Sequence, residues 1–262
     1  MLLQDKVIFL TGGSTGIGLD CAKAYALEGA KVAIVARNSM QAAQAAADLG
    51  PEHMGFSCDV SVDAEVKSAI ARVLDRYGKI DAIHNNAGIA TPSKPVHETS
   101  DDEWNTLFDI NLKSVLHTTR HGYQALLATK GCILNTSSLV GVIGQEIHAA
   151  YTATKGGMNT LTKSMALDYA KDGIRVNAVC PAGTWTPMLR DWAAHQPDPE
   201  GISHYLDDIH PLGYCPEGDV IADACVFLIS QKARFITGHI MHVSGGAEIG
   251  YRRITQPTEA PT

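Results

Sequence analysis

Tyr151 and Lys155 are the two residues of this sequence best suited by type and spacing to move a proton. They lie four positions apart in a segment with a helical pattern, and residues at that spacing share one helix face. A free tyrosine has a pKa of about 10, but a neighbouring ammonium favours the phenolate and lowers that pKa. We therefore expect Tyr151 to accept a proton from an alcohol, or to donate one to a carbonyl oxygen.

A glycine-rich segment, residues 11–18 (TGGSTGIG), lies between an expected strand and an expected helix. The free N–H groups and the partial positive charge of a helix N-terminus suit a pyrophosphate. Glycine lets the backbone approach phosphate oxygens without interference from a Cβ atom. Its place in the first strand–helix unit predicts that this turn binds a dinucleotide.

Apolar runs of strand length alternate with helical patterns along most of the chain. The expected strands are 6–11, 31–36, 54–58, 80–84, 132–136, 174–179 and 239–243. The expected helices follow the glycine turn to about residue 29 and cover 39–49, 62–77, 101–129 (as one or two helices), 151–169 and 221–230. Continuous apolar strands separated by helices predict a parallel sheet covered on both faces, in a doubly wound α/β sandwich of three layers.

The expected domain organisation is a single dinucleotide-binding catalytic domain over residues 1–250, followed by a C-terminal tail over residues 251–262. Residues 181–216 form the one long irregular stretch, and such stretches are usually functional. We expect a substrate lid at about residues 183–215. Trp185, Met188, Leu189 and Trp192 begin it, either as a cover for an apolar part of the substrate or as ordinary packing.

The composition is that of a globular protein, with 45% hydrophobic and 19% charged residues in a chain of 262. The formal net charge of -7, without a basic stripe, argues against a nucleic-acid partner. The six cysteines are scattered and are expected to be buried free thiols. No apolar run approaches the roughly 20 residues that span a bilayer, and the first residues are too polar for a secretory signal. We expect a cytoplasmic protein with no membrane contact.

Four motifs in order resemble the short-chain dehydrogenase/reductase family, in its single-domain branch. They are the glycine turn at 11–18, NNAG at 85–88, Ser138, and the Tyr151-x-x-x-Lys155 pair. The resemblance extends over nearly the whole chain, from about residue 3 to residue 249. It implies a Rossmann-like fold with a seven-stranded parallel sheet, a nicotinamide cofactor, a ketone or alcohol substrate, and a homotetramer or dimer.

The resemblance also assigns expected roles to individual residues. The catalytic residues are Asn111, Ser138, Tyr151 and Lys155. Ser138 lies thirteen residues before Tyr151, the usual family offset, and is therefore preferred over Ser137. Ser138 is expected to donate a hydrogen bond to the reacting oxygen, Lys155 to bond the nicotinamide ribose, and Asn111 to hold a water.

The residues expected to contact the cofactor come from six parts of the chain. They are Gly12, Ser14, Thr15, Gly16, Ile17, Gly18, Arg37, Asp59, Val60, Asn86, Ala87, Gly88, Tyr151, Lys155, Pro181, Thr184 and Thr186. The segment from Pro181 to Thr186 resembles the family's P-G-x-x-x-T motif, with Ala182 in place of the glycine.

The end of the second strand favours NADP(H) over NAD(H). An acidic residue there bonds the adenosine ribose and repels a 2′-phosphate, and this chain has the uncharged Ala36 at that position. Arg37 follows, and a guanidinium suits a phosphate. Thr15 stands where many NADP-dependent relatives carry a second basic residue, so NAD(H) stays an alternative.

No metal site is expected. His117 and His121 have a possible ligand spacing, but without an H-E-x-x-H context they are interpreted as surface or interface histidines. The predicted function is hydride transfer between NADP(H) and a carbonyl or secondary alcohol. The alternatives are an NAD-linked alcohol or diol dehydrogenase, a non-catalytic dinucleotide sensor, and a methyltransferase on a similar sheet.

Overall fold

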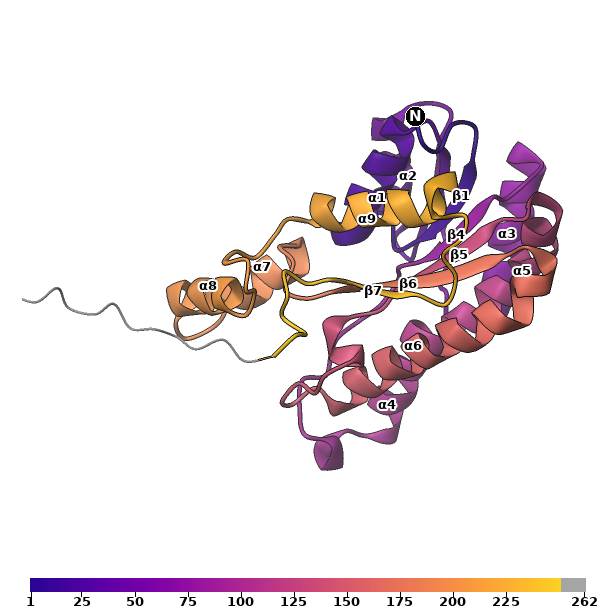
Figure 1. The fold of residues 1–262 in the computed structure, drawn as a ribbon. Coiled ribbons are helices and arrows are strands. Elements are labelled where there is room, and N and C mark those ends of the chain that lie inside the picture. The colour runs from indigo at the N-terminus through magenta and orange to yellow at the C-terminus, as the bar shows by residue number, and fades with distance from the viewer. Residues whose placement is uncertain (251–262) are drawn as a thin grey trace, which may run out of the picture.

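The computed structural model describes residues 1–250 and contains a seven-stranded parallel sheet in the order β3-β2-β1-β4-β5-β6-β7 (Figure 1). The strands are β1 (Val7–Thr11), β2 (Lys31–Ala36), β3 (Met54–Ser57), β4 (Ala82–Asn85), β5 (Cys132–Thr136), β6 (Arg175–Pro181) and β7 (Ile240–Val243). The predicted doubly wound, Rossmann-like α/β fold is therefore confirmed. The tail predicted at 251–262 lies outside the described residues.

Helices cover both faces of this sheet (Figure 1). One face carries α1 (Gly16–Leu27), α2 (Ser39–Leu49) and α9 (Gly218–Ile229), and the other carries α3 (Asp63–Tyr77), α5 (Ser114–Thr129) and α6 (Ala149–Tyr169). Strand β1 shows why the apolar runs are continuous: Ile8 and Leu10 pack in the first layer, while Val7 and Phe9 pack in the second. Successive side chains point to opposite faces, so both alternate sets must be apolar.

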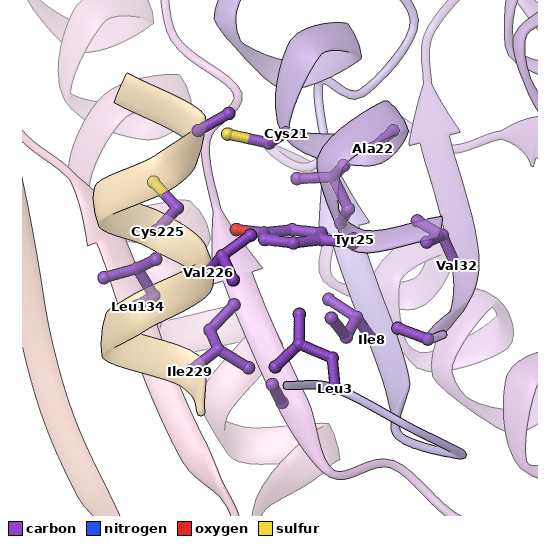
Figure 2. Packing of buried hydrophobic residues seen from close by; sticks show 14 of the residues in the cluster. Leu3, Ile8, Cys21, Ala22, Tyr25, Val32, Leu134, Cys225, Val226 and Ile229 are labelled. Atoms are coloured by element: carbon purple, nitrogen blue, oxygen red, sulfur yellow. The ribbon is translucent and has the colours of Figure 1, made fainter. Parts of the chain in front are cut away.

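The packing of α1 against α9 fixes the helix that begins at the glycine turn. Figure 2 shows Tyr25 of α1 lying against α9 beside Cys225 and Val226, with Leu3 and Ile229 close by. Tyr25 is fully buried, and its hydroxyl lies 2.9 Å from Nδ1 of His84 on β4. An aromatic ring buried with its polar end satisfied stabilises the contact between the helix layer and the sheet.

The strand order reverses between β1 and β4, because the chain first runs outward through β2 and β3 and then returns to the other side of β1. Ligands of open α/β sheets bind at the carboxyl ends of the strands on either side of such a reversal. The glycine turn follows β1, NNAG overlaps the end of β4, and Ser138 follows β5. The topology therefore brings three of the sequence motifs to one edge of the sheet.

Two segments differ in detail from the sequence expectation. The helical region 101–129 consists of α4 (Asp101–Phe108), a π-helical turn (Asp109–Lys113) and α5. The long irregular stretch contains α7 (Pro187–Ala194) and α8 (Pro199–Asp208), which extend beyond the ends of β6 and β7 (Figure 1). Thr186 and Asp198 cap these two helices, each followed directly by a proline in the first turn. Among the helices of residues 1–250, none is long and apolar enough to cross a membrane.

Candidate active site

The glycine turn is shaped by two positive backbone angles and two close approaches. Gly12 has φ 65° and Gly16 has φ 54°, a region that favours glycine. A Cβ on Gly12 would lie 2.8 Å from Cα of Ala87, and a Cβ on Gly18 would overlap the carbonyl of Gly12. The turn can therefore lie against the end of β4 only with glycine at these positions, which leaves the first N–H groups of α1 open to the cleft.

Asn86 ties this turn to the neighbouring strand. Its Nδ2 donates to the carbonyls of Thr11 (3.2 Å) and Gly12 (3.1 Å), and its backbone N–H donates to Oγ1 of Thr11. The N–H of Ala87 donates to the same hydroxyl. Because both motifs share these bonds, the two strand ends hold one another in place, and the shape of the glycine turn is fixed by the protein itself.

Lys155 is buried below the cleft with 3% of its surface exposed. Its Nζ donates to the carbonyl of Thr136 at 2.8 Å and lies 5.7 Å from the centre of the Tyr151 ring. Burial lowers the pKa of Lys155 to about 8, because the charged form loses hydration. The side chain is thus aligned with Tyr151 by a backbone bond at the end of β5.

Ser138 and Tyr151 face one another across the cleft floor, and their side chains are hydrogen-bonded. Ser137 instead donates its hydroxyl to the carbonyl of Lys155 at 3.2 Å and is buried. The structure therefore brings together the predicted Ser138, Tyr151 and Lys155, and directs Ser137 away from the tyrosine. A substrate oxygen between Ser138 and Tyr151 would have two hydroxyl groups within reach.

The expected lowering of the Tyr151 pKa is wrong for the protein alone. Burial raises the pKa of Tyr151, and the hydrogen bond from Ser138 only partly opposes that rise. The ammonium of Lys155 points at the Thr136 carbonyl rather than at the phenol oxygen. The loss of hydration at the ring therefore outweighs the distant charge. In this state Tyr151 is a proton donor at neutral pH.

Asn111 lies behind the cleft floor, fully buried in the π-helical turn. Its Oδ1 accepts from the N–H of Ile89 at 2.8 Å, while its Nδ2 donates to the carbonyl of Ile89 at 2.8 Å and to Oγ1 of Thr154 at 3.1 Å. Single π-helical turns are frequent at functional sites. The Asn111 side chain fastens the loop after NNAG to α6, next to Tyr151 and Lys155. Its water-holding role stays a prediction.

A single cleft of about 1680 Å³ connects the glycine turn to the catalytic candidates. Every residue predicted to contact a cofactor lines it, and so do Ser138 and Tyr151. Sites for drug-sized ligands measure roughly 300–1,000 Å³, so this space is large enough for a dinucleotide with a small substrate beside it. Sequence reasoning missed several lining residues near Tyr151, including Ser93, Gln145 and His148. Gln145 and His148 were signalled only by polar residues in the stretch before Tyr151, and nothing in the sequence links Ser93 to that stretch.

The lining of the cleft differs between its two ends. At the end of β2, Ala36 and Arg37 line it beside the glycine turn. In the predicted lid, Met188, Leu189 and Trp192 line it, whereas Trp185 lies outside and carries Arg190 over its ring at 5.0 Å. The apolar cluster expected at the lid is therefore three residues and not four.

The histidines need one correction. His117 is buried, with Nδ1 3.0 Å from the carbonyl of Val60, so the expectation of a surface or interface position is wrong for it. The α5 helix turns that ring inward, while Nε2 of His121 lies 3.1 Å from Oδ1 of Asp63.

Cys21, His84 and Cys225 bring possible metal-ligand atoms within 4.8 Å of one another. Both His84 nitrogens are already bonded, to Tyr25 and to Thr136, and burial lowers the pKa of His84 to about 3. The cluster is a satisfied core network, and all six cysteines are buried free thiols as predicted.

Comparison with known proteins places this geometry among oxidoreductases. A family model described as Enoyl-(Acyl carrier protein) reductase matches residues 12–248. The chain is 36% identical over 260 residues to L-fucose dehydrogenase of Bos taurus, covering 98% of this chain and 96% of the relative. It is 35% identical over 246 residues to 2,5-dichloro-2,5-cyclohexadiene-1,4-diol dehydrogenase of Sphingobium indicum, covering 93% and 97%. A solved structure of 3-ketoacyl-(acyl-carrier-protein) reductase from Brucella melitensis with NADH has a TM-score of 0.86 at 31% identity, covering 94% of this chain and 99% of that chain.

Proposed function

Because the chain belongs to the short-chain dehydrogenase/reductase family, we propose that it interconverts a hydroxylated secondary alcohol and its ketone, with NADP(H) as the preferred cofactor. The chain is an NAD(P)-dependent oxidoreductase that acts on alcohol or carbonyl groups. The observation that carries the proposed reaction is a single cleft that is lined both by the glycine turn and by Ser138, Tyr151 and Lys155.

The residues present fit a nicotinamide dinucleotide. A Cβ would fill the cradle at Gly12 and Gly18, and the helix N-terminus behind it favours an anion. The proposed contacts are those predicted from the sequence: the glycine turn for the pyrophosphate, Asp59 and Val60 for the adenine, and Thr186 for the nicotinamide amide. When bound, the cofactor supplies or accepts the hydride.

The protein's own part in the reaction is to hold the substrate oxygen and move its proton. Ser138 donates a hydrogen bond to that oxygen, and Tyr151 donates the proton during reduction or removes it during oxidation. Lys155 keeps positive charge beside the ring and bonds the nicotinamide ribose, while the Thr136 carbonyl sets its direction. Asn111 holds the loop at Ile89 that forms the adjacent wall.

The cofactor preference rests on the end of β2. Arg37 is exposed, lines the cleft, and has no carboxylate partner within residues 1–250. Among the acidic residues that line the cleft, Asp59 is the one closest to Arg37 in the sequence. Its Oδ1 accepts hydrogen bonds from the N–H and the hydroxyl of Ser61. A guanidinium without an internal partner can bind a 2′-phosphate, and Ala36 offers nothing that repels one.

The test is a titration of the purified protein with NADPH and with NADH, followed by nicotinamide fluorescence. We expect tighter binding of NADPH, and we expect Arg37→Ala to weaken NADPH binding about tenfold or more while leaving NADH almost unchanged. Arg234→Ala, which removes a guanidinium outside the cleft, is the matched control. Equal losses for both cofactors in Arg37→Ala would reject the preference and favour an NAD-linked dehydrogenase. Tight binding without turnover of any alcohol or ketone would instead favour the sensor.

A further inference from the structure

Ser93 and His148 join two separate loops beside the catalytic tyrosine. Oγ of Ser93 lies 2.8 Å from Nε2 of His148, and both side chains line the cleft. Ser93 belongs to the loop that follows NNAG, while His148 is the N-cap position of α6, three residues before Tyr151. The rings of His148 and Tyr151 meet edge to face with their centres 6.4 Å apart. A polar pair thus stands next to the reacting position.

The hydrogen bonds of His148 decide which of its nitrogens can accept. Nδ1 lies 2.9 Å from the carbonyl of Glu146, and a carbonyl only accepts, so Nδ1 carries the hydrogen. In the neutral ring Nε2 is then an acceptor, and the hydroxyl of Ser93 donates to it. The face toward the cleft therefore presents one ring nitrogen that takes a hydroxyl hydrogen, and one hydroxyl oxygen with free lone pairs.

The backbone before His148 is held in an unfavourable conformation. Ile147 has φ 53°, a left-handed angle that is rare for a β-branched residue. The Ile147 side chain is 48% exposed, so apolar packing does not account for that conformation. Backbone outliers of this kind cluster at ligand sites, where the geometry they impose is used. Here the outlier directly precedes His148, whose side chain lines the cleft.

We infer that Ser93 and His148 are a specificity-determining pair that recognises a second hydroxyl of the substrate, one or two carbons from the reacting carbon. The inference rests on the proposed function, since it needs a substrate oxygen at Tyr151. A substrate hydroxyl donates to Nε2 of His148 in place of Ser93, and the Ser93 hydroxyl turns to donate to the substrate oxygen. The hydrogen bond between Ser93 and His148 is exposed to solvent, so it can be exchanged for a bond to the substrate at little net cost.

The rest of the cleft lining sets the other side of the substrate. Ile143, Met188 and Trp192 line the same cleft with apolar surface. A ligand that meets both kinds of wall has a hydroxylated edge and an apolar face. Deoxy sugars and cyclic diols have that chemistry, and long unsubstituted acyl chains do not.

The experiment compares substrates that differ by one hydroxyl. Wild-type protein, His148→Phe and Ser93→Ala are assayed for oxidation of cyclohexanol and of cis- and trans-1,2-cyclohexanediol, with the cofactor that binds more tightly. We expect the ratio of kcat/KM for the better diol to that for cyclohexanol to fall roughly five- to tenfold in His148→Phe, and less in Ser93→Ala. The value of kcat/KM for cyclohexanol and the Kd of the cofactor should stay within about twofold.

Two controls separate recognition from structure. His97→Phe changes an exposed histidine outside the cleft and should leave all ratios unchanged. His148→Gln keeps a side-chain acceptor and should recover part of the diol preference. A parallel fall for cyclohexanol and both diols would show that the pair only holds the loops and would overturn the inference. Absence of turnover of every substrate by the wild-type protein would overturn the proposed function and this inference together.

Discussion

Two parts of the cleft are built in opposite ways. The floor consists of Ser138, Tyr151 and Lys155 with Asn111 behind them, and the wall consists of α7 and α8. On the floor, Asn111 and Lys155 are 0% and 3% exposed, and each polar atom is bonded to backbone or to a neighbouring side chain. On the wall, Met188, Trp192 and Tyr205 are 61%, 44% and 58% exposed on two short helices. Buried polar groups must keep their partners, whereas exposed apolar groups can change with little cost. Under the proposed function, the catalytic residues are held by buried hydrogen bonds, and the residues that would meet the substrate lie on segments that the core constrains less.

The largest effect expected is at the floor, from Tyr151→Phe. The variant keeps the ring and removes only the hydroxyl, so proton transfer is lost while the packing stays. We expect kcat to fall about a thousandfold with cofactor affinity unchanged. Steady-state rates and a cofactor titration of the same preparation check this. Retention of a tenth of the activity would show that another group moves the proton.

The same hydroxyl also predicts opposite pH dependences for the two directions. Burial raises the pKa of Tyr151, so the neutral phenol persists into the alkaline range and only its ionised form can take a proton. The kcat/KM for alcohol oxidation should rise with pH through that range, while that for ketone reduction should fall. Tyr151→Phe should show neither trend in its residual activity.

Glycine substitutions compare a closely packed part of the cleft with an open one. A Cβ on Gly18 would meet the Gly12 carbonyl and the Asn86 side chain, whereas a Cβ on Gly144, in the loop before α6 that also lines the cleft, would have nothing within 4 Å. We expect Gly18→Ala to lower the free energy of unfolding by about 1–3 kcal/mol and to weaken cofactor binding. Gly144→Ala should do neither. Denaturant unfolding of both variants, with and without cofactor, measures the difference, and similar values for the two would contradict it.

A smaller effect is expected from the titration of Lys155. Its pKa of about 8 lies below the ordinary lysine value, so the ammonium is present at pH 7 and is lost as pH rises through 8. Cofactor affinity should therefore weaken between pH 7 and pH 9, by about tenfold at most, since about one molecule in ten keeps the charge at pH 9. Lys155→Met should bind more weakly and without this pH dependence. A flat profile for the wild-type protein would assign the ribose contact elsewhere.

The sequence predicted that the residues of the floor would lie close together, because three of its motifs follow buried strands. A strand such as residues 132–136 can only lie in the sheet, so Ser138 must emerge at its carboxyl edge with the glycine turn. The helical spacing of Tyr151 and Lys155 then fixes their common face. The sequence pattern could not give the direction of the pKa shift of Tyr151. That shift depends on the burial of Tyr151 and on the direction of the Lys155 Nζ, which donates to the carbonyl of Thr136.

The wall was predicted only as an irregular stretch, and for a physical reason. Helices α7 and α8 are only 8 and 10 residues long, and each buries a single residue, Ala193 or Leu206, so the apolar pattern that marks a helix is too short to be distinctive. Their starts were readable from a cap followed by proline at Thr186 and Asp198. His148 was missed because its neighbour Ser93 lies 55 positions away, and only the fold brings the two together.

Trp192→Ala is expected to have a small effect on stability and is the clearest test of the wall. The indole lines the cleft and is nearly half exposed, so its removal leaves no closed cavity and should change the free energy of unfolding by less than about 1 kcal/mol. If the wall selects substrates, KM for an apolar ketone such as a cyclohexanone with a bulky substituent should rise several-fold, while that for a small polar ketone stays unchanged. Leu167→Ala, at an 81% exposed apolar residue outside the cleft, is the matched control. Equal KM values for both ketones in Trp192→Ala would mean that the wall merely covers the cleft, and specificity would then have to come from the polar side near His148.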